Sequence, residues 1–196
     1  MAKLIVSNIV SLDGYIAGPG GNPAVLPMDQ AFDAYNLERL RSAGTLVLGR
    51  KTFEMFRGFW PAVQHAADAP PVLREISRLN SHIPKTVVSD SLVVEPGSAW
   101  SDASVLRREH AIAGLARAKA SSDKDLLVFG SRTLWNSLLA AGLVDELHLM
   151  VGNVLVGSGE PAFTSQAPQP LTLIAERRFA GSQNVLLQYA CGAGPQ

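Results

Sequence analysis

Short apolar runs that end at a glycine and lead directly into a helix-like segment recur along this chain. The two clearest are "TLVLG" at residues 45–49 and "LLVFG" at residues 126–130. Runs of this length and character are typical of strands that are covered on both faces, and a glycine permits a sharp turn into a helix. Strands that alternate with helices pair as parallel neighbours, because a helical crossover returns the chain to the same edge of the sheet. The alternation therefore predicts an α/β fold.

The remaining segments extend this pattern along the chain. We expect further strands at residues 3–10, 85–91 and 145–156, the last bent near Gly152, and helices at residues 30–43, from 52 to a stop at Pro61, 71–79, 111–119 and 131–141. Asp29 is expected to cap the first of these helices and Gly44 to end it. Residues 171–179 and 184–191, with "AGSQ" between them, predict an antiparallel C-terminal hairpin. We expect residues 1–196 to form one three-layer domain, with a mostly parallel sheet between helices on both faces.

Composition excludes several classes of function. The chain is 47% hydrophobic with a formal net charge of zero, which is typical of a compact soluble protein and gives no bulk charge for nucleic acid or membrane surfaces. The single cysteine, Cys191, cannot form a disulfide framework or a cysteine metal cluster, and it suits a reducing cytoplasm. The four histidines lack metal-ligand spacing, so no metal site is predicted. No secretory signal, membrane-length apolar run, GxSxG, HExxH or GKS/T motif is found.

The turn "GRKT" at residues 49–52 has the chemistry of a phosphate site. Gly49 allows the turn, the following helix offers free N–H groups, and Arg50 and Lys51 add positive charge. Thr52 adds a hydroxyl donor. The same residues are also consistent with a solvated basic turn in which Thr52 is an ordinary N-cap.

A second turn of this kind follows residues 126–130. Ser131, Arg132 and Thr133 again place small or donor-bearing side chains at a helix start. The sequence is not GxGxxG, so the Rossmann dinucleotide fingerprint is absent. Two such turns on one sheet could nevertheless hold two phosphates of one dinucleotide. The alternative for the second turn is a simple Ser131 cap.

Asp33 is the candidate acid. Its spacing from Leu37 and Leu40 places it on the stripe of the first helix that faces the sheet. A carboxyl group that is partly buried there has a raised pKa and can donate a proton near neutral pH or bind an N–H-rich heterocycle. The alternative places Asp33 at the solvent edge of the stripe. The glycine-rich loop "SLDGYIAGPGGN" (residues 11–22) is either a lid over this site or a simple connection.

Five segments in order resemble the dihydrofolate-reductase-like superfamily. They are "NIVSLDGYIAG", "LVLGRKTFEMF", "TVVSDS", "LLVFGSRTLWNSLLAAGLVDELHLMV" and "LVGSGEPAF", within a similarity that extends from about residue 3 to residue 189. They are most similar to the branch that contains the reductase domain of the bacterial riboflavin-biosynthesis deaminase-reductase. The resemblance implies a dihydrofolate-reductase-like fold and NADPH as hydride donor.

The resemblance also implies roles for individual residues. Gly49, Arg50, Lys51 and Thr52 would hold the adenosine 2′-phosphate and adjoining phosphates, with Ser89 at the adenosine end. The turn formed by Phe129, Gly130, Ser131, Arg132, Thr133 and Leu134 would surround the diphosphate. Ile9 and Ile16 would meet the nicotinamide through backbone groups. Asp33 is the candidate catalytic residue, and Asp13, Asp29 and Glu160 are candidate substrate-binding residues.

Two departures from the family pattern bear on the reaction. Dihydrofolate reductases usually carry a second glycine at the position of Ser131, and the riboflavin branch often carries a proline at that of Asn153. No zinc-deaminase motif is found in the chain. The expected function is an NADPH-dependent reductase of the 5-amino-6-(5-phosphoribosylamino)uracil reductase type, acting on a pyrimidine-like or pterin-like molecule. A dihydrofolate or pterin reductase and a non-catalytic NADP-binding module are the alternatives. The resemblance also implies a homodimer that buries part of the C-terminal hairpin and of the strand at residues 146–151. The alternative is a monomer whose sheet edge is blunted by Glu176, Arg177 and Arg178.

Overall fold

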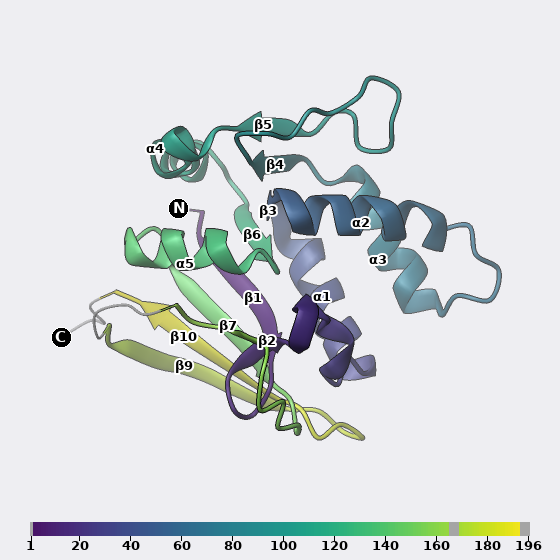
Figure 1. The fold of residues 1–196 in the computed structure, drawn as a ribbon, viewed down its shortest axis with the longest axis vertical. Helices are drawn as coiled ribbons and strands as arrows, with labels where there is room; N and C mark the ends of the chain where they lie inside the picture. The colour runs from purple at the N-terminus through teal and green to yellow at the C-terminus, as the bar shows by residue number, and fades with distance from the viewer. Residues whose placement is uncertain (1, 165–168, 193–196) are drawn as a thin grey trace.

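The centre of the molecule is an eight-stranded sheet in the order β5-β4-β3-β6-β1-β7-β10-β9 (Figure 1). The computed structural model describes residues 2–164 and 169–192. The parallel strands are β1 (Leu4–Val10), β3 (Ala43–Gly49), β4 (Lys85–Val88), β5 (Ser104–Leu106), β6 (Asp125–Phe129) and β7 (Glu146–Val151). The last strand in the chain, β10 (Val185–Cys191), runs antiparallel to β7 and to the edge strand β9 (Leu171–Arg178). The expectation of a mostly parallel sheet with a C-terminal antiparallel hairpin is confirmed.

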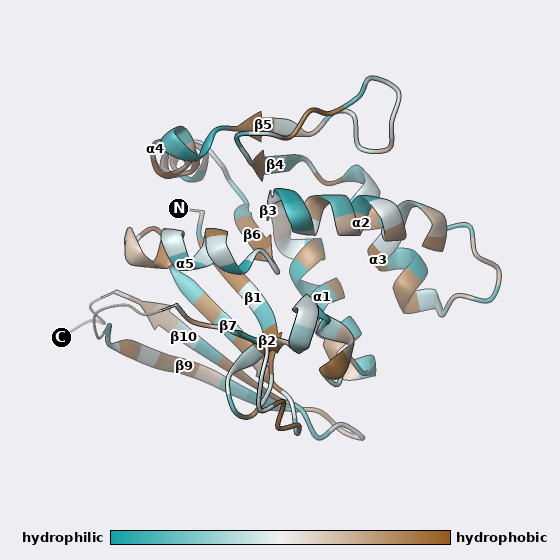
Figure 2. Ribbon diagram, in the orientation of Figure 1, coloured by the Kyte–Doolittle hydropathy of each residue, from teal (hydrophilic) through white to brown (hydrophobic). Residues whose placement is uncertain are grey.

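Helices cover both faces of the sheet, as expected for three layers. α1 (Gln30–Ser42), α2 (Arg50–Val63) and α3 (Pro71–His82) contribute to a core with one face of the sheet. α4 (Arg108–Ala120) and α5 (Arg132–Ala140) pack against the other face in a second core. Hydrophobic residues concentrate along the central strands (Figure 2), because helices cover these strands on both faces.

Two boundaries differ from the sequence prediction because of local packing. Gly44 does not end α1 but lies inside β3, where a Cβ atom would come within 2.7 Å of the Lys124 Cβ, so the position needs a residue without a side chain. Pro61 does not stop α2, which continues to Val63. A proline in the last turn removes only one helical hydrogen bond, and Trp60 beside it packs against the core under α2.

The strand expected at residues 145–156 is also wrong in its second half, because β7 ends at Val151. Gly152 passes so close to Pro27 that a Cβ atom would lie 2.6 Å from the Pro27 Cγ. The chain then leaves the sheet, and part of it returns as β8 (Glu160–Pro161), which pairs with β2 (Tyr15–Ala17) in a small separate sheet. The sequence did not predict β2, β5, β8 or the 3-10 turns η1 (Pro19–Gly21) and η2 (Pro23–Val25).

Candidate cofactor and substrate site

The two strand–glycine–helix turns lie side by side, because β3 and β6 are parallel neighbours. The backbone N–H of Gly49 donates to the Ser131 Oγ at 2.8 Å, and the backbone N–H of Ser131 donates to the Thr52 Oγ1 at 3.0 Å. Each turn therefore holds the other in place. A ligand that spans both turns would meet a preformed surface.

The Ser131 and Thr52 hydroxyl groups accept hydrogen bonds from the neighbouring turn and leave both helix starts uncapped. Neither Gly49 nor Ser131 provides a side-chain cap to the helix that follows it. Thr52 is buried and lies inside α2, so the alternative in which it caps this helix is wrong, and so is the alternative of a simple Ser131 cap. The first N–H groups of a helix have no intrahelical partner, and their partial positive charge favours anions. Both helix starts thus offer donors at the same edge of the sheet.

The second turn has an unusual backbone. Gly130 and Ser131 both adopt left-handed conformations, with φ of 51° and 56°. For serine this conformation is unfavourable, and here it is held by the two hydrogen bonds across the gap. A Cβ atom on Gly130 would lie 3.1 Å from the Thr52 Cγ2, so glycine also keeps the two turns close together.

The basic side chains surround these turns but are not all free. Arg50 is exposed and forms an ion pair with Glu54, one turn along α2, at 3.2 Å. Lys51 is exposed. The Arg132 Nε donates to the Pro161 carbonyl, which ties α5 to β8.

The structure also shows where the remaining candidate residues near β4 and β6 lie. Ser89 follows β4 at the same edge, and its buried Oγ accepts from the N–H groups of Ser91 and Leu92. Phe129 is buried at the end of β6, Leu134 packs into the core, and Thr133 is exposed on α5.

Ile9 lies where β1 extends beyond β6. The β1–β6 pairing ends at Ser7 and Phe129, whereas β1 stays paired with β7 as far as Val10. The Lys3 carbonyl accepts from β6, and the Val10 carbonyl accepts from the β7 side. Alternation along the strand then points the N–H and C=O of Ile9 toward the β6 side, where β6 has ended. Because β6 ends at Phe129, it offers no strand partner to these two groups, which makes them candidate contacts for a ligand. Ile16 is half-buried on β2 and packs beside the α5 core.

Asp33 is half-buried in the first turn of α1, as the stripe with Leu37 and Leu40 predicts. Burial, and to a lesser extent the charge of Asp29, raises the pKa of Asp33 to about 6. No hydrogen bond from the described residues reaches this carboxyl group. α1 leads directly into the start of β3, so the first turn of α1 lies at the edge of the sheet where β3 ends, which also carries the two strand–glycine–helix turns. Asp33 therefore lies at the edge of the sheet that carries both turns, and a raised carboxyl pKa of this kind is typical of functional sites.

Asp29 caps α1, as predicted. Its Oδ1 accepts from the N–H groups of Ala31 and Phe32, and its Oδ2 accepts from the Ser182 Oγ at 2.5 Å. These hydrogen bonds lower the pKa of Asp29 against the opposing effect of burial. A direct role in substrate binding stays a prediction.

Asp13 joins two loops beside the site. Its carboxylate accepts from the Ser11 Oγ at 2.6 Å and from the N–H groups of Val156 and Gly157. The Ser11 bond and these two backbone bonds lower the pKa of Asp13 to about 2. The loop expected to form a lid is thus tied to the segment after β7. Glu160 is exposed on β8, and its contact with substrate also stays a prediction.

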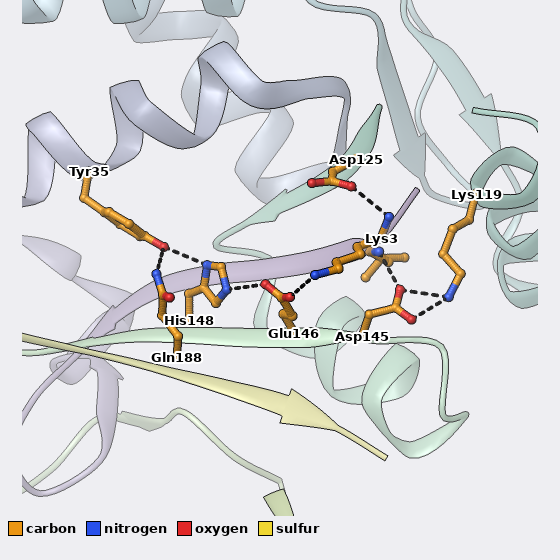
Figure 3. A network of polar contacts seen from close by, with 9 residues as sticks. Lys3, Tyr35, Lys119, Asp125, Asp145, Glu146, His148 and Gln188 are labelled. Atoms are coloured by element: carbon orange, nitrogen blue, oxygen red, sulfur yellow. Dashed lines mark hydrogen bonds and ion pairs between the residues drawn. The ribbon is translucent and has the colours of Figure 1, made fainter. Parts of the chain in front are cut away.

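A buried polar row under α1 was not predicted from the sequence (Figure 3). The Tyr35 hydroxyl lies 2.7 Å from the His148 Nδ1, and the His148 Nε2 lies 2.8 Å from the Glu146 Oε2. Lys3 donates to the other Glu146 oxygen at 2.5 Å, and Gln188 donates to the Tyr35 hydroxyl at 2.9 Å. His148 lies in β7, and its partner Tyr35 on α1 is a tertiary contact without a sequence signal, as is the contact between Tyr35 and Gln188 on β10.

Features of other site types are not found in the described part of the chain. Residues 2–164 and 169–192 contain no group of three or more histidine, cysteine, aspartate or glutamate side chains that could hold a metal ion. The same residues form no helix long and apolar enough to cross a membrane.

The fold and the site together define a class. The chain has a dihydrofolate-reductase-like fold. Its features are a strand inserted between β3 and β1, a C-terminal antiparallel strand pair, and two uncapped helix starts at one edge of the sheet. The chain belongs to the RibD C-terminal domain family, whose sequence profile matches residues 2–187.

Individual proteins are similar to this chain at low identity. The protein YyaP of Bacillus subtilis (strain 168), described as uncharacterized, is 24% identical over 163 residues, which cover 82% of this chain and 80% of YyaP. A putative riboflavin biosynthesis protein from Shewanella sp. PV-4 has a similar structure, with a TM-score of 0.66, 22% identity, and coverage of 97% of this chain and 99% of that one.

A larger protein shares the fold over part of its length. The diaminohydroxyphosphoribosylaminopyrimidine deaminase/5-amino-6-(5-phosphoribosylamino)uracil reductase of Thermotoga maritima has a TM-score of 0.69 and 12% identity. The match covers 97% of this chain and 57% of the Thermotoga protein. These structural likenesses show the fold, and the family that matches residues 2–187 is one of reductase domains.

Proposed function

We propose that this protein is an NADPH-dependent reductase of the 5-amino-6-(5-phosphoribosylamino)uracil reductase type, acting on a pyrimidine-like or pterin-like small molecule. The observation that carries the proposal is the cross-linking of the two turns by Gly49, Ser131 and Thr52. It brings two anion-binding helix starts together at one edge of the sheet, as a dinucleotide with separate phosphates requires. The family of the chain supports the same function.

The residues present fit NADPH. The start of α2, with Arg50, Lys51 and Thr52, would bind the adenosine 2′-phosphate, and Ser89 would lie at the adenosine end. The start of α5, from Gly130 to Leu134, would bind the diphosphate. The free backbone groups of Ile9 match the donor and acceptor of a carboxamide, and Ile16 would lie beside the same ring. NADPH supplies the hydride when bound.

Asp33 would supply the proton. A carboxyl group with a pKa of about 6 is protonated in a useful fraction of molecules near neutral pH and can also hydrogen-bond a ring nitrogen. Asp13 and Glu160 lie on the loops that would border the substrate, and Asp13 would act by holding those loops together. The main contribution of the protein to the rate is then the positioning of hydride donor and acceptor.

Two alternatives remain in view. The half-buried Asp33 on the first helix also favours a dihydrofolate or pterin reductase, because such a carboxyl group suits a pterin ring. A non-catalytic NADP-binding module would need the cofactor turns but not Asp33.

A turnover assay with NADPH separates these functions. Purified protein would be incubated with NADPH and a panel of aminopyrimidines, dihydrofolate and pterins, with oxidation followed by the nicotinamide absorbance. Turnover of an aminopyrimidine supports the proposal, and turnover only of dihydrofolate or pterins supports the first alternative. Tight NADPH binding without any turnover supports the binding module, and failure to bind NADPH at all would overturn all three.

The proposal also covers domain organisation, cellular compartment and oligomeric state. We propose that residues 1–196 act as one domain, that the protein works in the cytoplasm, where its single thiol stays reduced, and that it forms a homodimer. The continuous eight-stranded sheet supports the first of these, and the exposed edge strand β9 supports the last.

A further inference from the structure

Asn8 has a buried side chain without a partner. The residue is 7% exposed, and its Nδ2 lacks both solvent contact and a hydrogen bond within the described residues. Most buried side-chain amides are hydrogen-bonded, because removing their donors from water without replacement is unfavourable. A polar, β-disfavoured residue in the middle of a central strand therefore needs a reason.

The position of Asn8 suggests that reason. Its neighbours Val6 and Val10, two residues away on either side in β1, belong to the core under α4 and α5, so alternation places the Asn8 side chain on this same face. Ser7 is the register partner of Phe129, the last residue of β6. Asn8 is therefore level with Gly130, where the chain leaves the sheet and α5 begins. The unpaired amide therefore lies on the α5 side of β1, one residue before Ile9.

We propose that the Asn8 side-chain amide is a cofactor-binding donor, with its N–H groups directed at an acceptor oxygen of the bound dinucleotide. This inference rests on the proposed function. The acceptor is either an oxygen of the diphosphate at the Gly130–Ser131 turn or the carboxamide oxygen of the nicotinamide beside Ile9. Because Nδ2 is shielded from solvent in the free protein, the amide must turn toward the ligand, which then completes a hydrogen bond that the free protein lacks.

The proposal makes stability and binding change in opposite directions. In Asn8→Leu the side chain keeps nearly the same shape and loses its polar atoms. The free protein should melt at the same or a higher temperature, because an unsatisfied buried donor has been removed. The dissociation constant for NADPH should rise about tenfold, the ratio typical of one lost hydrogen bond.

Two buried asparagines serve as controls. Asn136 on α5 donates to the carbonyls of Arg132 and Ala162, so Asn136→Leu should lower the melting temperature. Asn80 is buried on α3, away from the carboxyl edge of the sheet, so Asn80→Leu should leave NADPH binding unchanged. Binding would be measured by titration calorimetry at a temperature where each variant is folded by circular dichroism.

A fragment distinguishes the two acceptors. 2′-Phospho-ADP-ribose keeps the diphosphate and lacks the nicotinamide. If Asn8→Leu weakens this fragment and NADPH equally, the acceptor is on the diphosphate; if it weakens only NADPH, the acceptor is the carboxamide. Asn8→Ala, which removes the N–H groups without adding charge, should weaken binding in the same way and checks the result should the leucine variant fold poorly.

An unchanged dissociation constant in both Asn8 variants would overturn the inference, whatever the melting temperature. A melting temperature lowered as far as in Asn136→Leu, with binding intact, would show an amide that supports the fold instead. If the unmodified protein binds neither NADPH nor the fragment, the proposed function itself has failed, which is a different result.

Discussion

The Tyr35 hydroxyl donates to the Nδ1 of His148 across the interface between α1 and the sheet, at 2.7 Å. This direction follows from Gln188, whose amide donates to the same hydroxyl and leaves the Tyr35 proton for the histidine. His148 is then neutral and donates from Nε2 to Glu146. The row fixes α1, and with it Asp33, against β7 and β10.

Tyr35→Phe should destabilise the protein by about 1–3 kcal/mol, because it leaves the His148 Nδ1 and the Gln188 amide unpaired in a buried place. Urea unfolding measures this difference. Tyr15→Phe is the matched control, since the Tyr15 hydroxyl is in an exposed contact with the Gly157 carbonyl at 3.4 Å, and it should change stability little. Equal midpoints for the two variants would mean that the buried row contributes nothing to folding.

The same row predicts a pH dependence. Burial lowers the pKa of His148 below its usual 6.5, against the opposing influence of Glu146. As the pH falls below about 6.5, the unfolded chain binds a proton at this histidine that the folded protein does not. The stability due to neutral His148 is therefore complete above this pH and lost as the pH falls toward the folded pKa.

Comparison with a variant isolates this effect from the carboxylates. The stability of the wild type minus that of His148→Gln should decrease between pH 7 and pH 5. His110→Gln, at an exposed position, should leave the pH profile of the wild type unchanged. A difference between wild type and His148→Gln that stays constant with pH would contradict the assignment of a neutral buried imidazole.

Asp33→Asn should lower turnover and raise stability. The raised pKa of about 6 means that the folded protein binds a proton between about pH 4 and pH 6 that the unfolded chain does not, so this carboxyl group favours folding at low pH and opposes it above pH 6. At pH 7.5 the amide should stabilise by about 1 kcal/mol, allowing for partial solvent contact. Turnover should fall about 100-fold with NADPH binding intact. A loss of stability at pH 7.5 would show that the ionised carboxylate has a supporting partner after all.

Arg50→Ala combined with Lys51→Ala should remove most of the preference for NADPH over NADH, a loss of more than tenfold if each charge-assisted contact contributes about 1.5–3 kcal/mol. Since Arg50 is paired with Glu54, Lys51→Ala alone should have the larger effect of the two single changes. The dissociation constants for both cofactors, measured in low and physiological salt, test this. Equal affinity of the unmodified protein for NADPH and NADH would remove the basis of the 2′-phosphate assignment.

The edge strand β9 predicts self-association. Leu173 and Ile174 are 49% and 48% exposed, and Ile174 is the extra residue of a β-bulge opposite Gln188 and Tyr189. An unpaired edge with exposed apolar residues favours pairing with another chain. Light scattering at micromolar concentration should give a mass near twice 20.9 kDa, and Leu173→Glu combined with Ile174→Glu should return it to the monomer value. A mass that stays near 20.9 kDa as the concentration rises would rule out the dimer.

Local signals accounted for most of the fold. The sequence correctly predicted the glycine that ends β3, the glycine that follows β6, the Asp29 cap and the apolar runs of the central strands, because all of these are properties of neighbouring residues. The errors arose where contacts between residues far apart in the sequence determine where a strand ends. The end of β7 depends on the close approach of Pro27 to Gly152, and β5 has three residues without a strong apolar pattern.

The candidate site likewise contains features that local sequence predicts and features that depend on distant residues. The two turns were predicted from glycines and basic residues in sequence, but their mutual hydrogen bonds join residues about 80 positions apart. The side-chain hydrogen bonds of Tyr35 join residues 113 and 153 positions apart. Asn8 carries no sequence signal of its own, because a single polar residue in an apolar strand is informative only once its neighbours and its missing partner are known.

The insertion of β6 between β3 and β1 also determines when the binding surface can exist during folding. β3 and β1 are not neighbours in the finished sheet, and the strand that joins them begins only at Asp125. On the ribosome, the first 120 residues can collapse but cannot bring the Gly49 turn to its partner, because Ser131 has not yet been delivered to the centre of the sheet. Dinucleotide affinity should therefore appear late and in one step, which would make nucleotide retention a direct reporter of complete chain assembly.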